Sequence, residues 1–106
     1  MKPFEIIWSS FAEKELDKIF NYYSEVAGDS IAKNVIQNII SEPNQLLSNP
    51  KWGQLVEELL HRSFEYHYLI HKQFKLIYTV DDKMKKIKIT DIFDTRQHPQ
   101  KLNRNN

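Results

Sequence analysis

A chain of 106 residues with 41% hydrophobic and 27% charged content has the composition of one small globular domain, with no room for a second. The absence of cysteine excludes disulfides, thiolate zinc sites and a cysteine nucleophile, and it suits a reducing compartment. The net charge of +1 conceals an asymmetry, because residues 1–60 hold five Lys/Arg against nine Asp/Glu, whereas residues 61–106 hold ten against five. The basic half could meet nucleic acid or an acidic protein, or it could be an ordinary solvated face.

The N-terminus reaches an acidic residue at Glu5 and contains no long apolar run, which predicts neither a signal peptide nor a membrane span. We therefore expect a cytoplasmic protein. Residues 4–8 are β-branched and aromatic, and they predict a first strand. The pattern stops at Ser9 and Ser10, either of which can cap a following helix.

Two helices are predicted from apolar residues that recur at three- and four-residue steps. The first covers residues 10–27, with Glu13 placed to complete a capping box with Ser10. The second follows Gly28, with Ser30 as its expected cap and an isoleucine-rich stripe along one side. We therefore expect the two helices to form an antiparallel hairpin.

Turn residues follow the second helix. Pro43 is expected to kink this helix rather than end it, because apolar residues continue its stripe. Residues 49–53 read Asn-Pro-Lys-Trp-Gly, which is typical of a turn, and Trp52 is expected to fold back onto the core. Over residues 54–63 the sequence does not decide between a short helical turn and an irregular strand.

From residue 64 onward the apolar pattern has a period of two, which predicts strands over residues 64–70, 74–80 and 86–93. One face of the first two strands is expected to cover the helices; its residues are Phe64, Tyr66, Tyr68, Ile70, Phe74, Leu76, Tyr78 and Val80. The opposite face mixes polar and apolar groups, so something is expected to cover it in part. In the last strand a change of phase at Ile92 predicts a bulge near Thr90 or Asp91.

These elements predict an α+β fold. An N-terminal strand and an antiparallel helical hairpin would pack on one face of a small antiparallel sheet, in the order β-α-α-β-β-β. We expect residues 1–102 to form this single domain and residues 103–106 to be a frayed polar tail.

Metal and cofactor sites are not expected. His67 and His71 would share one face of a strand, but four residues of extended chain separate them by roughly 13 Å, too far to hold one ion. Two glycines cannot build a glycine-rich phosphate loop, and no nucleophile elbow accompanies a Ser-His-Asp set.

Phosphate chemistry on RNA is better supported by the residue types. Cleavage through the 2′-hydroxyl needs a base, an acid and cations that stabilise the charged phosphorane. Arg96, Lys75 and Arg62 could supply the charge, and His98 or His67 the proton transfer. The alternative interpretation is structural. Arg96 would then pair with Asp94 or Asp91, and His98 would be an ordinary loop residue.

The order of elements and three local patterns resemble the RelE/ParE superfamily, the toxins of bacterial type II toxin-antitoxin pairs, also described as plasmid stabilisation proteins. The first pattern is Ile7-Trp8-Ser9 followed by Ala12 and Leu16, and the second is residues 47–53, Leu-Ser-Asn-Pro-Lys-Trp-Gly. The third is residues 74–78, Phe-Lys-Leu-Ile-Tyr, followed by Ile89, Ile92 and residues 94–99, Asp-Thr-Arg-Gln-His-Pro. The likeness spans nearly the whole chain.

The resemblance implies the same fold and an antitoxin, encoded beside this chain, that wraps and neutralises it. RelE-like members cut messenger RNA on the ribosome, whereas ParE-like members act on DNA gyrase and lack the catalytic set. Lys75 stands where RNA-cutting members usually have arginine, and lysine lacks the bidentate fork that suits phosphate. Arg96 matches the arginine after the last strand, and His98 could stand in for the tail acid or base. The long hairpin and the Asn-Pro-x-x-Gly turn favour the ParE-like branch.

Three hypotheses follow. The first is a growth-inhibiting toxin that acts on gyrase without chemistry of its own. The second is a metal-independent, ribosome-dependent endoribonuclease that uses Lys75, Arg96 and His98. The third is a toxin-like module that only binds an antitoxin or takes part in regulation. The surfaces expected to bind nucleic acid, a target or the antitoxin carry Arg62, His67, Lys75, Thr79, Lys88 and Arg96, together with the exposed side of the hairpin.

Overall fold

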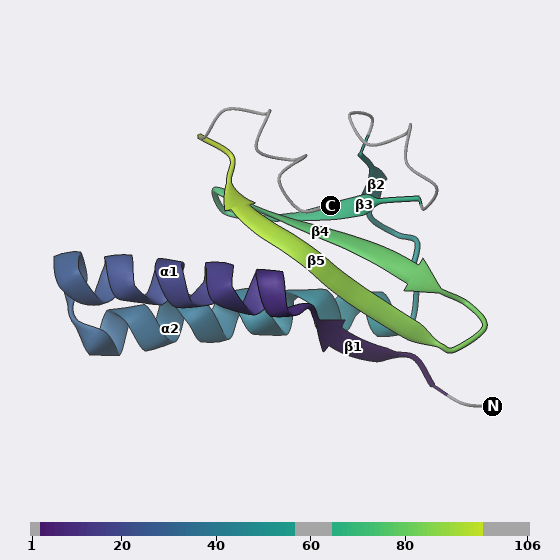
Figure 1. Cartoon of the computed structure of the whole chain (residues 1–106), viewed down its shortest axis with the longest axis horizontal. Helices are drawn as coiled ribbons and strands as arrows, with labels where there is room; N and C mark the ends of the chain where they lie inside the picture. The colour runs from purple at the N-terminus through teal and green to yellow at the C-terminus, as the bar shows by residue number, and fades with distance from the viewer. Residues whose placement is uncertain (1–2, 57–64, 97–106) are drawn as a thin grey trace.

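Two antiparallel helices pack on one face of a five-stranded sheet in the computed structural model, which describes residues 3–56 and 65–96 (Figure 1). The elements are β1 (Glu5–Trp8), α1 (Ser10–Ala27), α2 (Asp29–Ser41), the 3-10 helix η1 (Glu42–Leu47), β2 (Gln54–Leu55), β3 (His67–His71), β4 (Phe74–Asp81) and β5 (Lys86–Asp94). The hairpin of α1 and α2 extends past the end of the sheet, so its far half has no strand beneath it (Figure 1).

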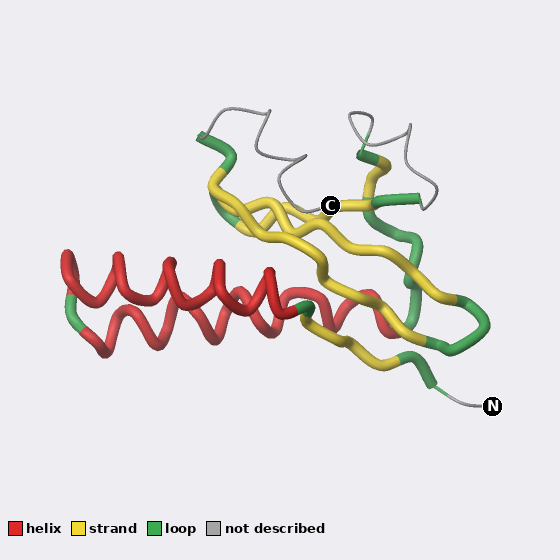
Figure 2. Tube along the Cα trace, in the orientation of Figure 1, coloured by secondary structure: helices red, strands yellow, loops and turns green. Residues whose placement is uncertain are grey.

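The sheet has the strand order β1-β5-β4-β3-β2 (Figure 2). Neighbouring strands from β2 to β5 are antiparallel, whereas β1 runs parallel to β5 with Trp8 opposite Ile89. The α+β fold with a hairpin on one face is therefore confirmed, but the sheet is mixed rather than wholly antiparallel. The parallel pairing arises because β1 lies beside the last strand of the chain, not beside a strand next to it in sequence.

The first helix covers the residues predicted for it. Its cap is Ser9, whose hydroxyl oxygen accepts a hydrogen bond from the Ala12 N–H at 3.0 Å. The capping box between Ser10 and Glu13 was therefore predicted one residue too late, since the third residue after the cap is Ala12. The Ser9 hydroxyl also donates to the Thr90 carbonyl oxygen at 3.2 Å, which ties the start of α1 to the sheet.

The second helix begins at Asp29 after Gly28, whose φ of +95° lies where only glycine is comfortable. Ser30 is therefore inside the helix, and the prediction that it forms the cap is wrong. Pro43 does not end the helical path, because η1 continues it and buries Leu46 completely. The predicted kink is thus a change from α to 3-10 geometry at a proline in the first turn.

The face of β3 that meets the helices is the opposite of the predicted one. Cross-strand pairs put His67 opposite Tyr78 and Leu69 opposite Leu76, so His67 and Leu69 are buried while Ile70 is 49% exposed. The prediction failed because one residue of register exchanges the two faces of a strand. The period-two apolar pattern predicts Tyr66, Tyr68 and Ile70 on the face that covers the helices.

The outer face of the sheet, away from the helices, has a small apolar cluster of its own. Val56, Ile77 and Phe93 are each less than a tenth exposed, and Tyr66 and Tyr68 pack against them. The predicted partial covering is found for the β4 half of this face, at Ile77, whereas His67 and Leu69, predicted to share that face, lie toward the helices. Part of the covering comes from β2 and the residue after it, which settles residues 54 and 55 as an irregular strand.

The predicted bulge in β5 is confirmed. Ile77 lies opposite Asp91 and Tyr78 lies opposite Ile89, so Thr90 has no residue directly across from it. The extra residue changes the phase of β5, so that Ile89 and Ile92 both face the helices.

Trp52 does not fold back onto the core, because its side chain is 59% exposed. The backbone of Gly53 takes that place instead, and its N–H donates to the hydroxyl of the fully buried Tyr78 at 2.9 Å. A methyl group at position 53 would lie 2.5 Å from this hydroxyl and 2.6 Å from the carbonyl oxygen of Tyr68. Only glycine therefore allows the turn to approach the sheet this closely.

We expect Gly53→Ala to lower the free energy of unfolding by about 1–3 kcal/mol, since the new methyl group must displace a backbone carbonyl. Urea denaturation followed by circular dichroism measures this. Tyr78→Phe is the matched control and should cost about 1 kcal/mol, because it removes only one hydrogen bond. In the Tyr78→Phe background the Gly53→Ala cost should fall, since the contact of the methyl group with the Tyr78 hydroxyl is gone. A wild-type midpoint for Gly53→Ala would contradict the close approach.

Candidate functional site

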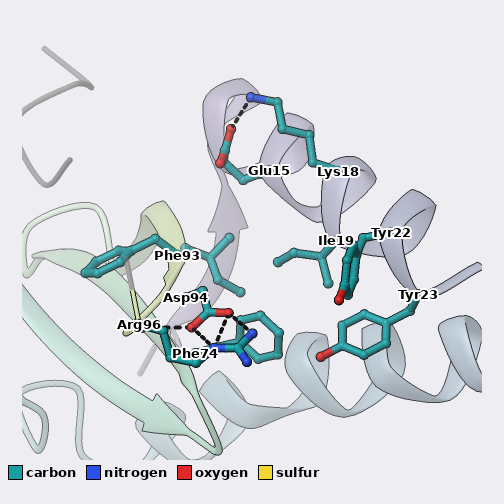
Figure 3. Close-up of a pocket in the computed structure, with 10 residues that line it drawn as sticks. Glu15, Lys18, Ile19, Tyr22, Tyr23, Phe74, Phe93, Asp94 and Arg96 are labelled. Atoms are coloured by element: carbon teal, nitrogen blue, oxygen red, sulfur yellow. Dashed lines mark hydrogen bonds and ion pairs between the residues drawn. The ribbon is translucent and has the colours of Figure 1, made fainter. Parts of the chain in front are cut away.

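A groove of about 330 Å³ lies between α1 and the end of the sheet formed by β4 and β5 (Figure 3). Its apolar lining comes from α1 on one side and the strands on the other, and its rim carries two pairs of opposite charges. The lining residues are Glu15, Lys18, Ile19, Tyr22, Tyr23, Phe74, Ile92, Phe93, Asp94 and Arg96. The groove exists because the helical hairpin continues beyond the last residues of β5.

Arg96 is held against Asp94 at the rim of this groove. Its Nε donates to both carboxylate oxygens at 2.9 Å, its Nη2 also contacts the carboxylate, and its backbone N–H donates to Oδ1 at 2.8 Å. The alternative interpretation from the sequence, that Arg96 pairs with Asp94, is therefore correct. The arginine Nη1 takes no part in this pair.

The same pair is connected to α1 through Gln73. Gln73 donates from its side chain to the Tyr23 hydroxyl at 3.0 Å, and its carbonyl oxygen accepts the Thr95 N–H at 2.7 Å. Figure 3 shows the hydroxyl of Tyr23 turned toward the Asp94 and Arg96 side of the groove. Arg96 is thus presented by a connected set of hydrogen bonds rather than by a free loop.

The electrostatics of this pair suit binding better than proton transfer. The Arg96 guanidinium holds the pKa of Asp94 below its ordinary value, and the Asp94 carboxylate raises the pKa of Arg96. Both shifts make the two groups more firmly ionised at neutral pH. A general acid or base needs the opposite, a pKa brought toward the working pH.

Lys75 and Lys88 lie on the other face of the sheet from Arg96. The Lys75 ammonium sits 4.0 Å from the ring centroid of Tyr68, which is a cation-π contact. Lys88 is exposed and lies opposite Thr79 on β4 and Ile7 on β1. Lys88, Thr79 and Ile7 border a shallow hollow of about 570 Å³ on this outer face. Its lining also contains Asp81 and Asp82, whose negative charges offset those of Lys86 and Lys88.

His67 is buried and does not belong to either surface. It is 5% exposed and stacks on Tyr78, with ring centroids 5.4 Å apart and an interplanar angle of 23°. Its Nε2 lies 3.7 Å from a Glu65 carboxylate oxygen, while its Nδ1 has no hydrogen-bond partner among the residues described. The register of β3 that turns His67 toward the helices takes it away from the surface expected to bind nucleic acid.

The remaining predicted site residues, Arg62 and His98, lie outside the described residues. Within residues 3–56 and 65–96, no cluster of three or more His, Asp or Glu side chains could hold a metal ion. Neither helix in that part of the chain is long and apolar enough to cross a membrane.

Among the described residues, Arg96, His67 and the pair Lys75 and Lys88 therefore lie in three different places. Arg96 borders the groove on the helix side, Lys75 and Lys88 lie on the outer face, and His67 is inside. Sequence reasoning placed Phe74 among the residues that cover the helices and did not identify the groove that it lines with Tyr23. The sequence did contain a signal for this groove. Tyr22 and Tyr23 are adjacent in the first helix, and a tyrosine hydroxyl needs a polar partner that a wholly apolar core does not offer.

Burial lowers the pKa of His67 below its ordinary value, an effect of Lys51 adds to this, and the Glu65 carboxylate opposes it. A histidine whose pKa is lowered by folding stabilises the fold above the unfolded-state pKa of about 6.5, and this stability is lost as the pH falls through the folded-state pKa. We therefore expect the free energy of unfolding to fall between about pH 7 and pH 5. His67→Phe keeps the stacked ring and should flatten this slope in urea titrations. An equal slope in both proteins would contradict the assignment to His67.

The comparisons with known proteins agree with this geometry. The family model described as the ParE toxin of type II toxin-antitoxin system, parDE, matches residues 6–99. No relative among curated protein sequences matches this chain.

Solved structures that share the fold include two from toxin-antitoxin systems. A chain of the chromosomal ParDE toxin-antitoxin system from P. aeruginosa matches with a TM-score of 0.67 and 22% identity, covering 86% of this chain and 95% of that one. A chain of the toxin-antitoxin complex RelBE2 from Mycobacterium tuberculosis matches with a TM-score of 0.62 and 14% identity, covering 88% and 99%. At these identities the structures show a common fold, and the family is shown by the sequence match. Because that match spans most of the chain, this protein belongs to the ParE toxin family of type II toxin-antitoxin systems.

Proposed function

We propose that this toxin inhibits growth by binding DNA gyrase without a chemical step of its own, and that an antitoxin encoded beside it neutralises it. The observation that supports the absence of chemistry is the separation of Arg96 from Lys75. Phe74 lies opposite Asp94 and faces the helices, whereas Lys75 lies opposite Phe93 on the outer face. Arg96 contacts Asp94 and therefore lies on the side of the sheet that faces the helices.

A phosphorane needs its cations within reach of the same phosphate oxygens. Two cations on opposite faces of a sheet cannot both contact one phosphate without moving. Each is also engaged already, Arg96 with a carboxylate and Lys75 with the ring of Tyr68. Recruiting either to RNA would mean breaking its present contact, which favours binding over catalysis for these residues.

The family match supports gyrase as the target, because ParE-like toxins act on gyrase. The two solved structures described above come from toxin-antitoxin systems, which supports an antitoxin as the partner. The ribosome and messenger RNA are the competing target, and one experiment separates the two.

Expression of the chain alone under tight induction should stop growth, produce gyrase-linked DNA breaks and leave messenger RNA ends unchanged in the same culture. Co-expression of the neighbouring antitoxin gene should restore growth. Cleaved messenger without DNA breaks would overturn the gyrase proposal in favour of an endoribonuclease. Normal growth with neither effect would favour a module that only binds its antitoxin.

Alanine substitutions at Arg96 and Lys75 test whether these residues bind a target or catalyse RNA cleavage. Arg96→Ala and Lys75→Ala should each weaken binding to purified gyrase by less than about tenfold, as expected for solvent-exposed charges. Arg96→Lys is the matched control, since it keeps the charge but loses the bidentate fork. Purified wild-type chain should leave ribosome-bound messenger intact. Cleavage that disappears in Arg96→Ala, with folding and ribosome binding retained, would contradict the proposal.

A further inference from the structure

The outward face of α1 carries a row of exposed side chains. The row consists of Lys14, Lys18, Tyr22 and Glu25. Steps of four, four and three residues place all of them on one side of the helix. We call this set the α1 row. It runs from the part of α1 above the sheet to the part that extends past the end of the sheet (Figure 1).

The centre of the α1 row is apolar. Tyr22 is 55% exposed, and Val26 beside it, one turn further along α1, is 60% exposed. The ring of Tyr22 packs edge-on against Tyr23, with ring centroids 5.2 Å apart, so it is presented to solvent in a fixed orientation. A rigid, exposed tyrosine is the residue type found most often at the centre of protein interfaces.

The charges around this centre are divided by sign. The two lysines precede the tyrosine, whereas Glu25 follows it. Asp29 adds to the acidic end, because a hydrogen bond from the Ser24 hydroxyl holds its carboxylate next to the last turn of α1. Lys18 contacts Glu15 at 3.0 Å (Figure 3), but its side chain is 74% exposed. An ammonium group has three N–H donors and can bind a second carboxylate at the same time.

Such a division makes the α1 row complementary to itself when two copies of α1 run antiparallel. If Asn21 lies opposite Tyr22 of a second copy, Lys18 lies opposite Glu25 of that copy. A twofold axis then produces the same ion pair a second time and brings the two tyrosines together at the axis. Parallel helices would instead place lysine against lysine and glutamate against glutamate, which like-charge repulsion disfavours.

The second helix lacks this pattern. Asp29 and Lys33 are the only charged residues of α2, and they lie one turn apart, so α2 has no separate regions of opposite charge. Amide side chains, those of Asn34 and Gln37, border the shallow hollow on its surface. The charge pattern that specifies a partner therefore belongs to α1.

We infer that two copies of this chain associate through the α1 row, antiparallel and about a twofold axis beside Asn21 and Tyr22. This inference goes beyond the proposed function and depends on neither gyrase nor the antitoxin. Lys18 and Tyr22 also line the groove beside Arg96, so the second copy lies at the rim of that groove. One pair of helices forms a small interface, for which we expect a dissociation constant on the order of 10 µM.

Sedimentation equilibrium of the purified full-length chain measures this association. Lys18→Glu and Glu25→Lys should each weaken the dimer by about tenfold, since each places like charges against each other at both copies of the contact. The double variant restores opposite charges and should return to within about threefold of wild type. Asp17→Lys is the matched control, because Asp17 is exposed on α1 but lies off the α1 row. Circular dichroism checks that each variant is folded.

The absence of cysteine allows a direct test of the geometry. A mixture of Lys18→Cys and Glu25→Cys chains should form a covalent dimer with a short thiol cross-linker. Either chain alone should form little, because the antiparallel arrangement separates identical positions by about two helical turns. Lys33→Cys, on α2, is the control and should form none. Efficient cross-linking of Lys18→Cys with itself would contradict the antiparallel arrangement.

The remaining outcomes are also distinct. A chain that is still monomeric at about 1 mM would overturn the inference, and so would a dimer that Lys18→Glu and Asp17→Lys weaken equally. Tyr22→Ser should weaken the dimer in the same direction as Lys18→Glu. If it leaves the mass unchanged but weakens binding to the purified product of the neighbouring antitoxin gene, this face belongs to the antitoxin. The inference then fails, while the proposed function stands.

Discussion

The hydroxyl of Tyr78 is the polar group on which the rest of this structure depends. Tyr78 has no exposed surface, so its O–H must be placed where a partner can reach it. That partner is the N–H of Gly53, and burial raises the pKa of Tyr78 while this N–H opposes the rise. One hydrogen bond therefore joins the turn after η1 to the centre of the sheet. The stacked ring of His67 covers the same tyrosine from β3.

This contact determines the course of the chain around it. Because Gly53 must come within hydrogen-bond distance of Tyr78, the residues before it turn away from β3 rather than continue the ladder. Trp52 is directed outward as a result, and β2 is limited to Gln54 and Leu55. Among the described residues, β3 therefore has no strand beside Ile70 on the β2 side.

Local sequence signals predicted those parts of the fold that depend on neighbouring residues. The first helix, the change of helix type at Pro43 and the bulge at Thr90 each follow from spacing within a few positions. The pairing of Arg96 with Asp94 is equally local, since two residues separate them and a turn brings them together.

Apart from the two helix caps, each predicted one or two residues too late, the failures concern contacts between distant segments. The parallel pairing of β1 with β5 joins residues more than eighty positions apart, and no pattern inside either strand specifies it. The face of β3 depends on its register with β4, and both of its faces carry large apolar residues. Alternation alone could not decide which of Tyr68 and Leu69 faces the helices, because both pack in apolar clusters, Tyr68 in the outer one and Leu69 in the inner one. The site predictions for His67 failed to give a surface residue for the same reason.

Arg96, Lys75 and Ile70 lie close together at one end of the sheet but face different directions, so a compact partner would contact only part of this surface. Lys75 and Ile70 lie opposite each other on one rung of the sheet, and Phe74 and Asp94 lie on the next rung. Arg96 follows Asp94 by two residues, just past the end of β5. Arg96, Lys75 and Ile70 nevertheless open in three directions: the helix side, the outer face and the edge. A rigid surface can cover one of these directions, whereas an extended chain that passes the end of the sheet can follow all three.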